Sequence, residues 1–314
     1  FMIHQETHLI LDESHHMKGA IAERYNQQSL QGMAVLDLAL YAKRRDILTG
    51  TPMPQGVYDI ASQFEFLYPY CGISNQIIDN PQNPGVAIKG YWTRTTKSHM
   101  KNDLPKTITH DPIGVEMSDK QYLFYDMVIS RYKLIYTLLR RNQMFGDIRA
   151  AVKRIQRISV DPYSLAEDLL NNKKKERDEF RDQIRGSDER AILQAVLDEK
   201  KLDSKDSKIS NKMFAAINKA NEIIDNGQKV IVWGQFVSTN EKIARYFAEK
   251  LNLNWEEIIL FSKINQEQKM ENIQNFNKKT MDIPILIAHP KTGGEGISLH
   301  HNCRNAIYLD RSYD

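Results

Sequence analysis

Short apolar runs alternate with longer segments of helical periodicity along this chain. Apolar runs bounded by polar residues are typical of strands buried in a parallel sheet. We predict such strands at residues 9–11, 44–48, 108–115, 229–233, 258–261, 283–288 and 306–309. Apolar residues recur at helical spacing within residues 20–43, 57–67, 118–141, 148–158, 213–226, 239–251 and 266–276. The pattern predicts an α/β protein with two parallel sheets separated along the chain by helices.

The middle of the chain is predominantly helical in pattern. Aromatic and aliphatic residues recur at helical spacing from Tyr122 to Leu139, and we expect this stripe to pack in a core rather than bind a cofactor. A run of mixed charge at residues 171–178 continues the helical pattern to about Lys201 and is more typical of a solvated helix than of a nucleic-acid tail. Residues 202–211 are rich in Asp, Ser and Lys, which predicts a linker.

A loop rich in Pro, Gly and Asn is predicted at residues 68–90, and it is too long to be a simple connection. Strands are also predicted very close to both ends of the chain. Domains rarely begin and end so tightly on core strands, so we expect the chain to be a piece of a longer protein.

The composition limits the number of domains and the class of partner. A chain of 314 residues, 41% of them hydrophobic, has enough apolar material for about two domains. Because 43 basic residues offset 40 acidic ones, the net charge of +3 points to no particular partner. Cys71 and Cys303 lie far apart and fit a reducing compartment. Neither a signal peptide nor an apolar run of the ~20 residues of a membrane span is recognisable, so we expect a cytoplasmic protein without a membrane partner.

Two adjacent carboxylates, Asp12 and Glu13, directly follow the first predicted strand. The carboxyl end of a parallel strand is where open α/β sheets place their ligands. In nucleotide hydrolysis, one carboxylate there holds Mg²⁺ and a second orients or deprotonates the attacking water. A simpler interpretation is that the pair caps the following helix together with Ser14. The two carboxylates alone do not decide between these interpretations.

Two further loops carry residues suited to binding a nucleotide or a nucleic acid. Residues 49–52, Thr-Gly-Thr-Pro, close the second predicted strand and would lie beside the carboxylates if the two strands pair in parallel. Alone, this segment is more typical of an ordinary turn. Residues 289–299 hold Gly293, Gly294 and Gly296, which would let backbone amides approach a phosphate. Their order matches neither the dinucleotide fingerprint nor the P-loop.

Together, the order and spacing of these segments resemble helicase superfamily two, and within it the Swi/Snf-like DNA translocases. Asp12-Glu13-Ser14-His15 resembles the DExH box of that family, and Leu48 to Pro52 is similar to its third motif. Arg94 to Lys97, with Leu104-Pro105-Lys106, resembles the basic block after the first lobe. Residues 229–236 and 291–299 are similar to the fourth and fifth motifs. The resemblance covers nearly the whole chain.

The resemblance implies an α/β fold with two RecA-like parallel-sheet lobes and a helical insertion between them. Residues 1–115 would be the C-terminal part of the first, DExH-box lobe, and residues 116–204 a Swi/Snf-type helical insertion. Residues 205–314 would be the second lobe, which stops before the sixth motif. The resemblance further implies an ATPase that moves on double-stranded DNA, with ATP and Mg²⁺ as cofactors.

The resemblance also implies roles for individual residues. Asp12 would hold Mg²⁺ together with ATP, and Glu13 would activate water. Thr49, Gly50 and Thr51 would couple the nucleotide site to DNA. The implied nucleotide contacts are Asp12, Glu13, His15, Gly294, Glu295 and Gly296, and the implied nucleic-acid contacts are Arg94, Lys97, Gln235, Lys291, Thr292 and Gly293. Contacts to DNA phosphates follow a strand without reading its sequence, as a translocase requires.

The chain lacks two elements of the family pattern, and a smaller departure is Ser262, where the family often has a glycine. No Gly-Lys dipeptide occurs in the 314 residues, so the P-loop lysine is absent. The arginine-bearing sixth motif, expected just after Asp314, is missing as well. An arginine finger alone supplies ~10³ to 10⁵ in rate in related enzymes. We therefore expect the longer protein to be an ATPase and this chain to be nearly inactive.

Two other functions remain open at this point. The fold could serve a non-catalytic nucleic-acid-binding or scaffold module, which would bind DNA weakly and show no effect of ATP. Alternatively, the chain could belong to the motor subunit of a phage-defence or restriction system, encoded by a bacterium or a phage, with a nuclease or methyltransferase as its partner. The chain itself contains no motif of either enzyme.

Overall fold

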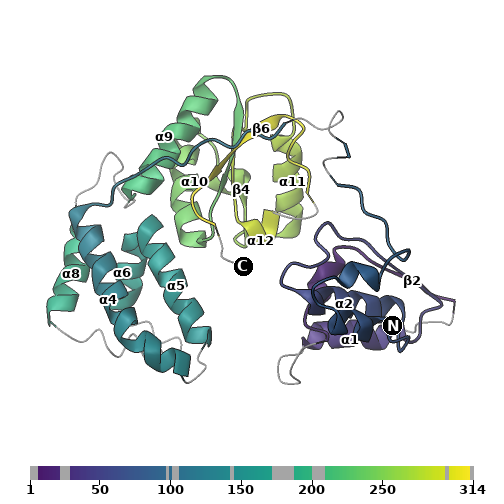
Figure 1. The fold of residues 1–314 in the computed structure, drawn as a ribbon. Coiled ribbons are helices and arrows are strands. Elements are labelled where there is room, and N and C mark those ends of the chain that lie inside the picture. Colours follow the sequence, from purple (N-terminus) through teal and green to yellow (C-terminus); the bar gives the residue numbers. More distant parts are fainter. Residues whose placement is uncertain are drawn as a thin grey trace. The chain divides into compact units, whose positions relative to one another are not determined.

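The computed structural model describes residues 6–21, 29–96, 99–100, 106–141, 145–171, 187–199, 209–293 and 297–311. The chain divides into two compact units, Phe1–His110 and Asp111–Asp314 (Figure 1). No helix within the described ranges combines the length and the apolar character needed to cross a membrane.

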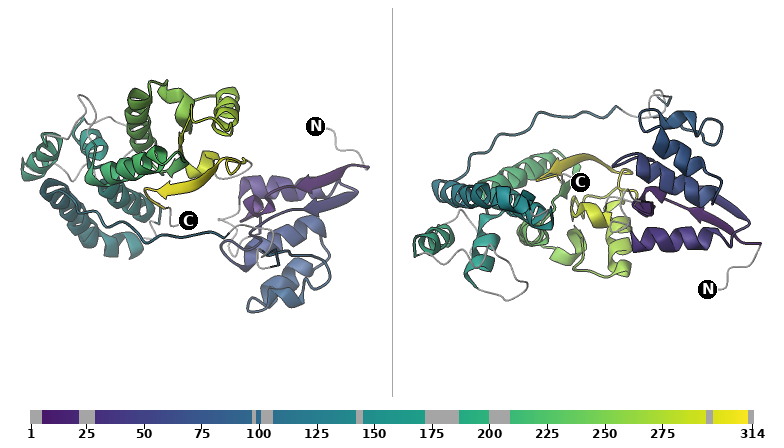
Figure 2. Two further views of the ribbon diagram at one scale, coloured as in Figure 1. Left: turned by 90° about the horizontal axis from the view of Figure 1, so that it is seen from above. Right: turned by 60° about the horizontal axis from the view of Figure 1, so that its bottom comes forward.

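The first unit contains a two-stranded parallel sheet with helices beside it. Strand β1 (His8–Leu11) pairs in parallel with β2 (Arg44–Ile47). The prediction that residues 9–11 form a buried strand is wrong, because Ile10 is 58% exposed. Helices α1 (Leu30–Ala39) and α2 (Val57–Leu67) lie alongside this pair (Figure 2). Strands and helices share one apolar cluster, made of Met17, Ala20, Ala39 and Phe66 with Leu9, Leu11, Val35, Leu36, Ile47 and Leu67 packed against it.

Residues 68–90 are more ordered than the predicted loop. They contain helix α3 (Ile73–Asp79) and the short 3₁₀ helix η3 (Pro84–Val86). Ile73, Ile77 and Ile88 are buried against Phe64 of α2, and this small core holds the segment in place. The expectation of a long loop is therefore wrong, because Ile73 and Ile77 form a helical apolar stripe too short to stand out among the surrounding turn residues.

The second unit contains a four-stranded parallel sheet. Strands β3 (Lys229–Trp233), β4 (Ile259–Leu260), β5 (Ile285–Ala288) and β6 (Cys303–Tyr308) lie in the order β4-β5-β3-β6. All residues of β5 are buried, which requires cover on both faces of the sheet. That cover comes from α9 (Asn211–Asp225), α10 (Val237–Leu251) and α11 (Gln266–Phe276), with the 3₁₀ helix η4 (Trp255–Ile258) leading into β4.

Helices α4 (Asp119–Arg141), α5 (Phe145–Val160), α6 (Pro162–Leu170) and α8 (Ser187–Leu197) precede this sheet along the chain. They share their own apolar core. The predicted packing stripe is confirmed at Val128 and Tyr132, which are buried in that core. Tyr122, however, is 60% exposed, and the neighbouring Phe124 is buried instead. Most of the charge run, residues 172–178, and residues 202–208 of the predicted linker lie outside the described residues.

The prediction of a strand at residues 108–115 is wrong. The described residues 106–118 run without regular structure, and Ile108 and Ile113 are 75% and 63% exposed. Alternation of apolar and polar residues makes a strand only where a neighbouring strand supplies hydrogen bonds, and Pro112 removes one donor from this segment. The predicted domain limits at residues 115 and 204 stay predictions.

Asp161 connects the helices of the second unit to its sheet layer. Its side chain is fully buried and caps α6 by accepting the Ser164 N–H at 3.1 Å. The same carboxylate accepts the Lys242 ammonium of α10 at 2.8 Å and the Thr239 hydroxyl at 3.3 Å. This buried ion pair fixes α6 against α10 within the second unit.

Candidate functional site

The strand pair β1–β2 carries two of the predicted functional loops at its carboxyl end. Hydrogen bonding continues past the strands: the Leu48 N–H donates to the Leu11 carbonyl at 2.8 Å, and the Ser14 N–H donates to the Leu48 carbonyl at 3.0 Å. Residues 12–15 and residues 48–51 therefore lie side by side, because the two strands meet the condition of parallel pairing set in the sequence analysis.

Glu13 has a left-handed backbone, with φ 49° and ψ 48°. This conformation is unfavourable for any residue that carries a Cβ. Asp12 stabilises it, because its Oδ1 accepts the Glu13 N–H at 2.9 Å. Glu13 stands at the N-cap of the 3₁₀ helix η1 (Ser14–Met17), yet its side chain makes no capping hydrogen bond. Helix capping therefore does not account for the Glu13 carboxylate, which is 43% exposed.

His15 links this turn to the second loop. Its Nδ1 lies 3.3 Å from Glu13 Oε2 and 3.1 Å from Thr49 Oγ1, and its side chain is only 15% exposed. Thr49 Oγ1 also accepts the Thr51 N–H at 3.1 Å. A continuous series of polar contacts thus runs from Glu13 through His15 and Thr49 to Thr51. Gly50 contributes no comparable contact, and a Cβ on it would meet nothing within 4 Å.

Gln63 of α2 is a functional candidate that the sequence analysis missed. The residue is 1% exposed. Its Oε1 accepts the Ser14 hydroxyl at 2.8 Å, and its Nε2 donates to the Pro52 carbonyl at 2.7 Å and to the Asp59 carbonyl at 3.1 Å. One buried amide therefore holds both loops. The signal that could have found it is a polar side chain among the apolar residues of a predicted helix.

The predicted basic block is not brought into contact with these loops. Arg94 is exposed, lies in an irregular segment, and makes no hydrogen bond or ion pair with the chain as far as the structure describes it. Lys97, Leu104 and Pro105 lie outside the described residues. A role of this block in binding nucleic acid stays a prediction.

The carboxyl end of the second sheet carries a second group of predicted residues. Asp310, which follows β6, accepts the Gln235 N–H through its Oδ1 at 2.8 Å. The Gly234 N–H donates to the Ala288 carbonyl at 3.1 Å, so the segment after β3 is also tied to the end of β5. A Cβ at position 234 would lie 2.1 Å from Asn240 Oδ1, so any other residue there would displace the buried Asn240 side chain.

The residues after β5 form the short helix α12 (Pro290–Gly293). The Lys291 N–H donates to His289 Nδ1 at 3.1 Å, while the lysine side chain is exposed. Gly293 packs against Trp233, and a Cβ there would lie 3.3 Å from the indole ring. Gln235, Lys291, Thr292 and Gly293 thus gather at the carboxyl end of one sheet, whereas Gly294, Glu295 and Gly296 lie outside the described residues.

Burial shifts the titration of the charged groups at this sheet end. It raises the pKa of Asp310, although the Gln235 N–H, Lys212 and His289 all favour the ionised carboxylate. Burial also lowers the pKa of His289 and the pKa of Lys212. Among the described residues, Asp310 Oδ2 has no hydrogen-bond partner. All three groups are therefore shifted toward their neutral forms.

Asp12 and Glu13 supply oxygen donors of the kind that Mg²⁺ prefers. Within the described ranges, no cluster of three His, Cys, Asp or Glu side chains could hold a metal ion. Mg²⁺ commonly binds through one or two carboxylates, with water and substrate phosphates completing its coordination. The pair therefore fits a Mg²⁺ ion carried by a nucleotide and does not form a metal site of its own.

No protein-family model matches this chain, and no curated protein matches it. Among solved structures, the chain is similar to the Sulfolobus solfataricus SWI2/SNF2 ATPase C-terminal domain, at 18% identity and a TM-score of 0.41, over 63% of this chain and 69% of that one. It is similar to the C-terminal part of the Fun30 ATPase domain at 16% identity and a TM-score of 0.41, over 64% and 74%. It is similar to the Pyrococcus furiosus Hef helicase domain at 14% identity and a TM-score of 0.48, over 99% and 66%.

Each of these structures is an ATPase or helicase domain. The α/β fold itself, with a parallel sheet in each unit, is confirmed by the strand pairing of this chain.

Proposed function

We propose that the protein is an ATP-dependent motor of the Swi/Snf type that moves on double-stranded DNA. The observation that carries the proposal is the position of His15, whose Nδ1 lies 3.3 Å from Glu13 and 3.1 Å from Thr49. A motor must connect the carboxylate that promotes hydrolysis to a loop that responds to DNA. An imidazole shared by the two loops provides such a connection, and an ordinary strand-ending turn does not need one.

Asp12 and Glu13 have different roles in this proposal. Bound ATP with Mg²⁺ supplies the phosphoryl group and a cation that neutralises its developing charge. Asp12, with one carboxylate oxygen already used by the Glu13 N–H, would hold the ion through its other oxygen. Glu13 is exposed enough to reach solvent and would orient the attacking water and accept its proton. His15 would hold the Glu13 carboxylate in place.

The DNA contacts are proposed from exposure and charge. Arg94 and Lys291 have exposed side chains that form no ion pair with the residues that the structure describes. Such cations are suited to phosphate contacts. Lys97, Gln235, Thr292 and Gly293 complete the proposed nucleic-acid contacts, and Gly294, Glu295 and Gly296 the proposed nucleotide contacts. Binding through phosphates predicts an affinity that falls steeply with salt concentration.

The chain itself is proposed to hydrolyse ATP slowly or not at all. No Gly-Lys dipeptide occurs in its 314 residues, so a lysine that cradles the β and γ phosphates would have to come from residues outside them. The test therefore uses two proteins: this chain, and an extended protein that adds any coding sequence that flanks it.

The experiment measures ATP hydrolysis with and without duplex DNA. We expect the extended protein to turn over and to respond to DNA, and its Glu13→Gln variant to lose hydrolysis. Glu116→Gln, the same substitution at an exposed residue of the other unit, is the matched control and should be fully active. Hydrolysis that survives Glu13→Gln would contradict the proposal.

The same experiment separates the two other functions. If the extended protein binds DNA but does not hydrolyse ATP, the chain is a nucleic-acid-binding or scaffold module. A nuclease or methyltransferase partner remains a prediction, which co-purification with the products of neighbouring genes would test.

A further inference from the structure

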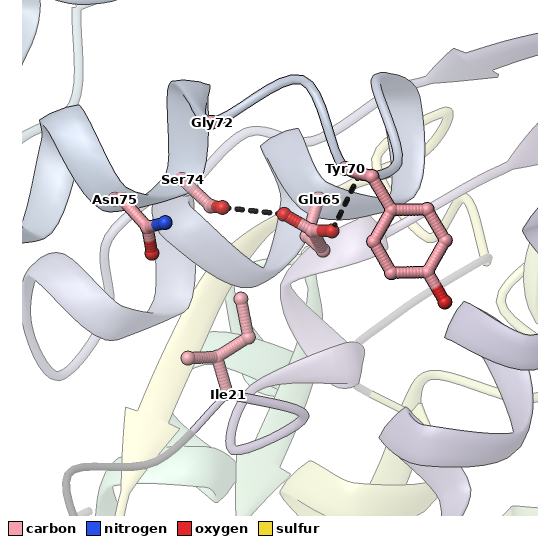
Figure 3. Close-up of a pocket in the computed structure, with 6 residues that line it drawn as sticks. All are labelled: Ile21, Glu65, Tyr70, Gly72, Ser74 and Asn75. Carbon is pink, nitrogen blue, oxygen red and sulfur yellow. Dashed lines mark hydrogen bonds between the residues drawn. The ribbon is translucent and has the colours of Figure 1, made fainter.

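A pocket of about 410 Å³ opens in the first unit, and none of its lining residues belongs to the proposed motor. It lies between the end of α2 and the beginning of α3. Figure 3 shows its lining residues, Ile21, Glu65, Tyr70, Gly72, Ser74 and Asn75. The volume falls in the range of small-ligand sites.

Glu65 places a fixed carboxylate in this pocket. Its Oε1 accepts the Tyr70 N–H at 2.9 Å, and its Oε2 accepts the Ser74 hydroxyl (Figure 3). Both donors are neutral, so the carboxylate is held in position without being neutralised. None of the described lining residues is basic, and Glu65 forms no ion pair with the residues that the structure describes. Each carboxylate oxygen can accept one more hydrogen bond.

Tyr70 presents an aromatic ring beside this carboxylate. Its backbone is left-handed, with φ 60°, and the residue is 84% exposed. The turn that holds it is well defined: the Cys71 N–H donates to the Tyr68 carbonyl at 3.2 Å, and Gly72 follows with φ 76°. A disfavoured backbone that directs a large aromatic side chain into solvent is unexplained by packing and points to a role in binding.

The chemistry of the lining selects one class of ligand. The fixed carboxylate would repel an anion, because none of the described lining residues is basic. An apolar ligand would remove water from the carboxylate without replacing its hydrogen bonds. A cation satisfies the carboxylate and is attracted to the face of an aromatic ring. Ile21 offers an apolar contact for a hydrocarbon stem, and the Asn75 amide offers a further polar contact (Figure 3).

We infer that this pocket binds an alkylammonium or alkylguanidinium group. The group comes either from a lysine or arginine side chain of a partner protein or from a free polyamine. This site is independent of ATP hydrolysis, so its test does not depend on the proposed motor.

The test is an NMR titration of the 314-residue chain with spermidine and, separately, with Nα-acetyl-arginine methylamide. We expect saturable shifts of the Tyr70, Gly72 and Asn75 amide signals. Saturation by spermidine at lower concentration identifies a free polyamine as the source, and saturation by the arginine derivative identifies a side chain. If neither probe shifts these signals, the inference is overturned.

Two variants and one control separate binding from folding. Glu65→Gln keeps an acceptor for the Tyr70 N–H but removes the charge, and it should weaken binding at least tenfold. Tyr70→Gly removes the ring and suits the left-handed backbone, so a several-fold loss of affinity there cannot arise from a strained turn. Tyr41→Ala removes another tyrosine of this unit, 64% exposed, and should leave affinity unchanged. Equal affinity in wild type, Glu65→Gln and Tyr70→Gly would also overturn the inference.

Discussion

His15 Nδ1 lies 3.1 Å from Thr49 Oγ1, which joins the loop after β1 to the loop after β2 through side chains. The same nitrogen lies 3.3 Å from Glu13 Oε2. One imidazole nitrogen cannot donate to both oxygens with full strength at once. A movement of the Thr49 loop would therefore change the hydrogen bonding of the Glu13 carboxylate, which is the behaviour expected of a coupling residue.

Replacing Thr49 with valine should uncouple hydrolysis from DNA. The substitution keeps the shape of the side chain but removes the hydroxyl that contacts His15 and accepts the Thr51 N–H. In the extended protein, we expect DNA stimulation of ATP hydrolysis to fall about tenfold, as the loss of about 1.4 kcal/mol of hydrogen bonding would give. The basal rate should change much less. Steady-state hydrolysis with and without duplex DNA measures both.

Thr51→Val is the matched control, because Thr51 enters this series of contacts only through its backbone N–H. It should keep most of the DNA stimulation. Equal losses of the basal and stimulated rates in Thr49→Val would show that the hydroxyl supports the fold rather than coupling.

Local sequence signals were sufficient for much of the fold. Helices α2 and α11 begin and end where predicted, and Asn265 caps α11 by accepting the Gln268 N–H at 2.8 Å. The parallel pairing of β1 and β2 was only conditional in the sequence analysis, because residues 44–46 are all charged. The limits and caps of the two helices depend on residues close together in the sequence.

Tertiary contacts explain what the sequence analysis missed. The partners of Gln63 at Ser14 and Pro52 lie 49 and 11 residues away, so no local pattern could reveal them. The prediction of a strand at residues 108–115 was wrong because a strand needs a neighbouring strand to pair with. The periodicity of apolar residues does not show whether such a neighbour is present. The left-handed turns at Glu13 and Tyr70 are held by local hydrogen bonds to the Asp12 and Glu65 carboxylates, one and five residues away, which hydrophobic periodicity does not report.

Gln63→Leu should destabilise the first unit. Leucine fits the buried position but leaves the Ser14 hydroxyl and the Pro52 carbonyl without their partner. Leaving buried polar groups unpaired costs about 1–3 kcal/mol. Urea unfolding followed by a probe in the first unit measures the change. Gln76→Leu, at an exposed position of α3, is the control and should alter stability far less; equal effects of the two substitutions would contradict a clamping role for Gln63.

Lys242→Met should destabilise the second unit strongly. Asp161 is fully buried, and loss of the ammonium at 2.8 Å would leave its charge without an ionic partner. Removing one member of a buried pair costs about 3–5 kcal/mol. Lys219→Met breaks an exposed pair with Glu222, also at 2.8 Å, and should cost only about 0–1 kcal/mol. Thermal melting of both variants compares their losses of stability. Similar losses in Lys242→Met and Lys219→Met would refute the role given to Asp161.

Asp310→Asn should stabilise the protein at neutral pH. Burial raises the pKa of Asp310, so the folded state binds its proton more tightly than the unfolded state does. The wild type therefore loses stability as pH rises from the ordinary carboxyl pKa of 3.8 through the raised value. Asparagine keeps an acceptor for the Gln235 N–H and does not titrate. Its melting temperature should exceed that of the wild type at pH 7, and the difference should shrink toward pH 4. A wild-type advantage that grows with pH would contradict this assignment.

Movement on duplex DNA tests the proposed function most directly. A third DNA strand bound to a duplex is released when a motor passes it, so its displacement by the extended protein reports translocation without strand separation. The account predicts release that requires ATP, is lost in Glu13→Gln and is retained in Glu116→Gln. Retention of the third strand while the extended protein hydrolyses ATP in response to DNA would contradict it.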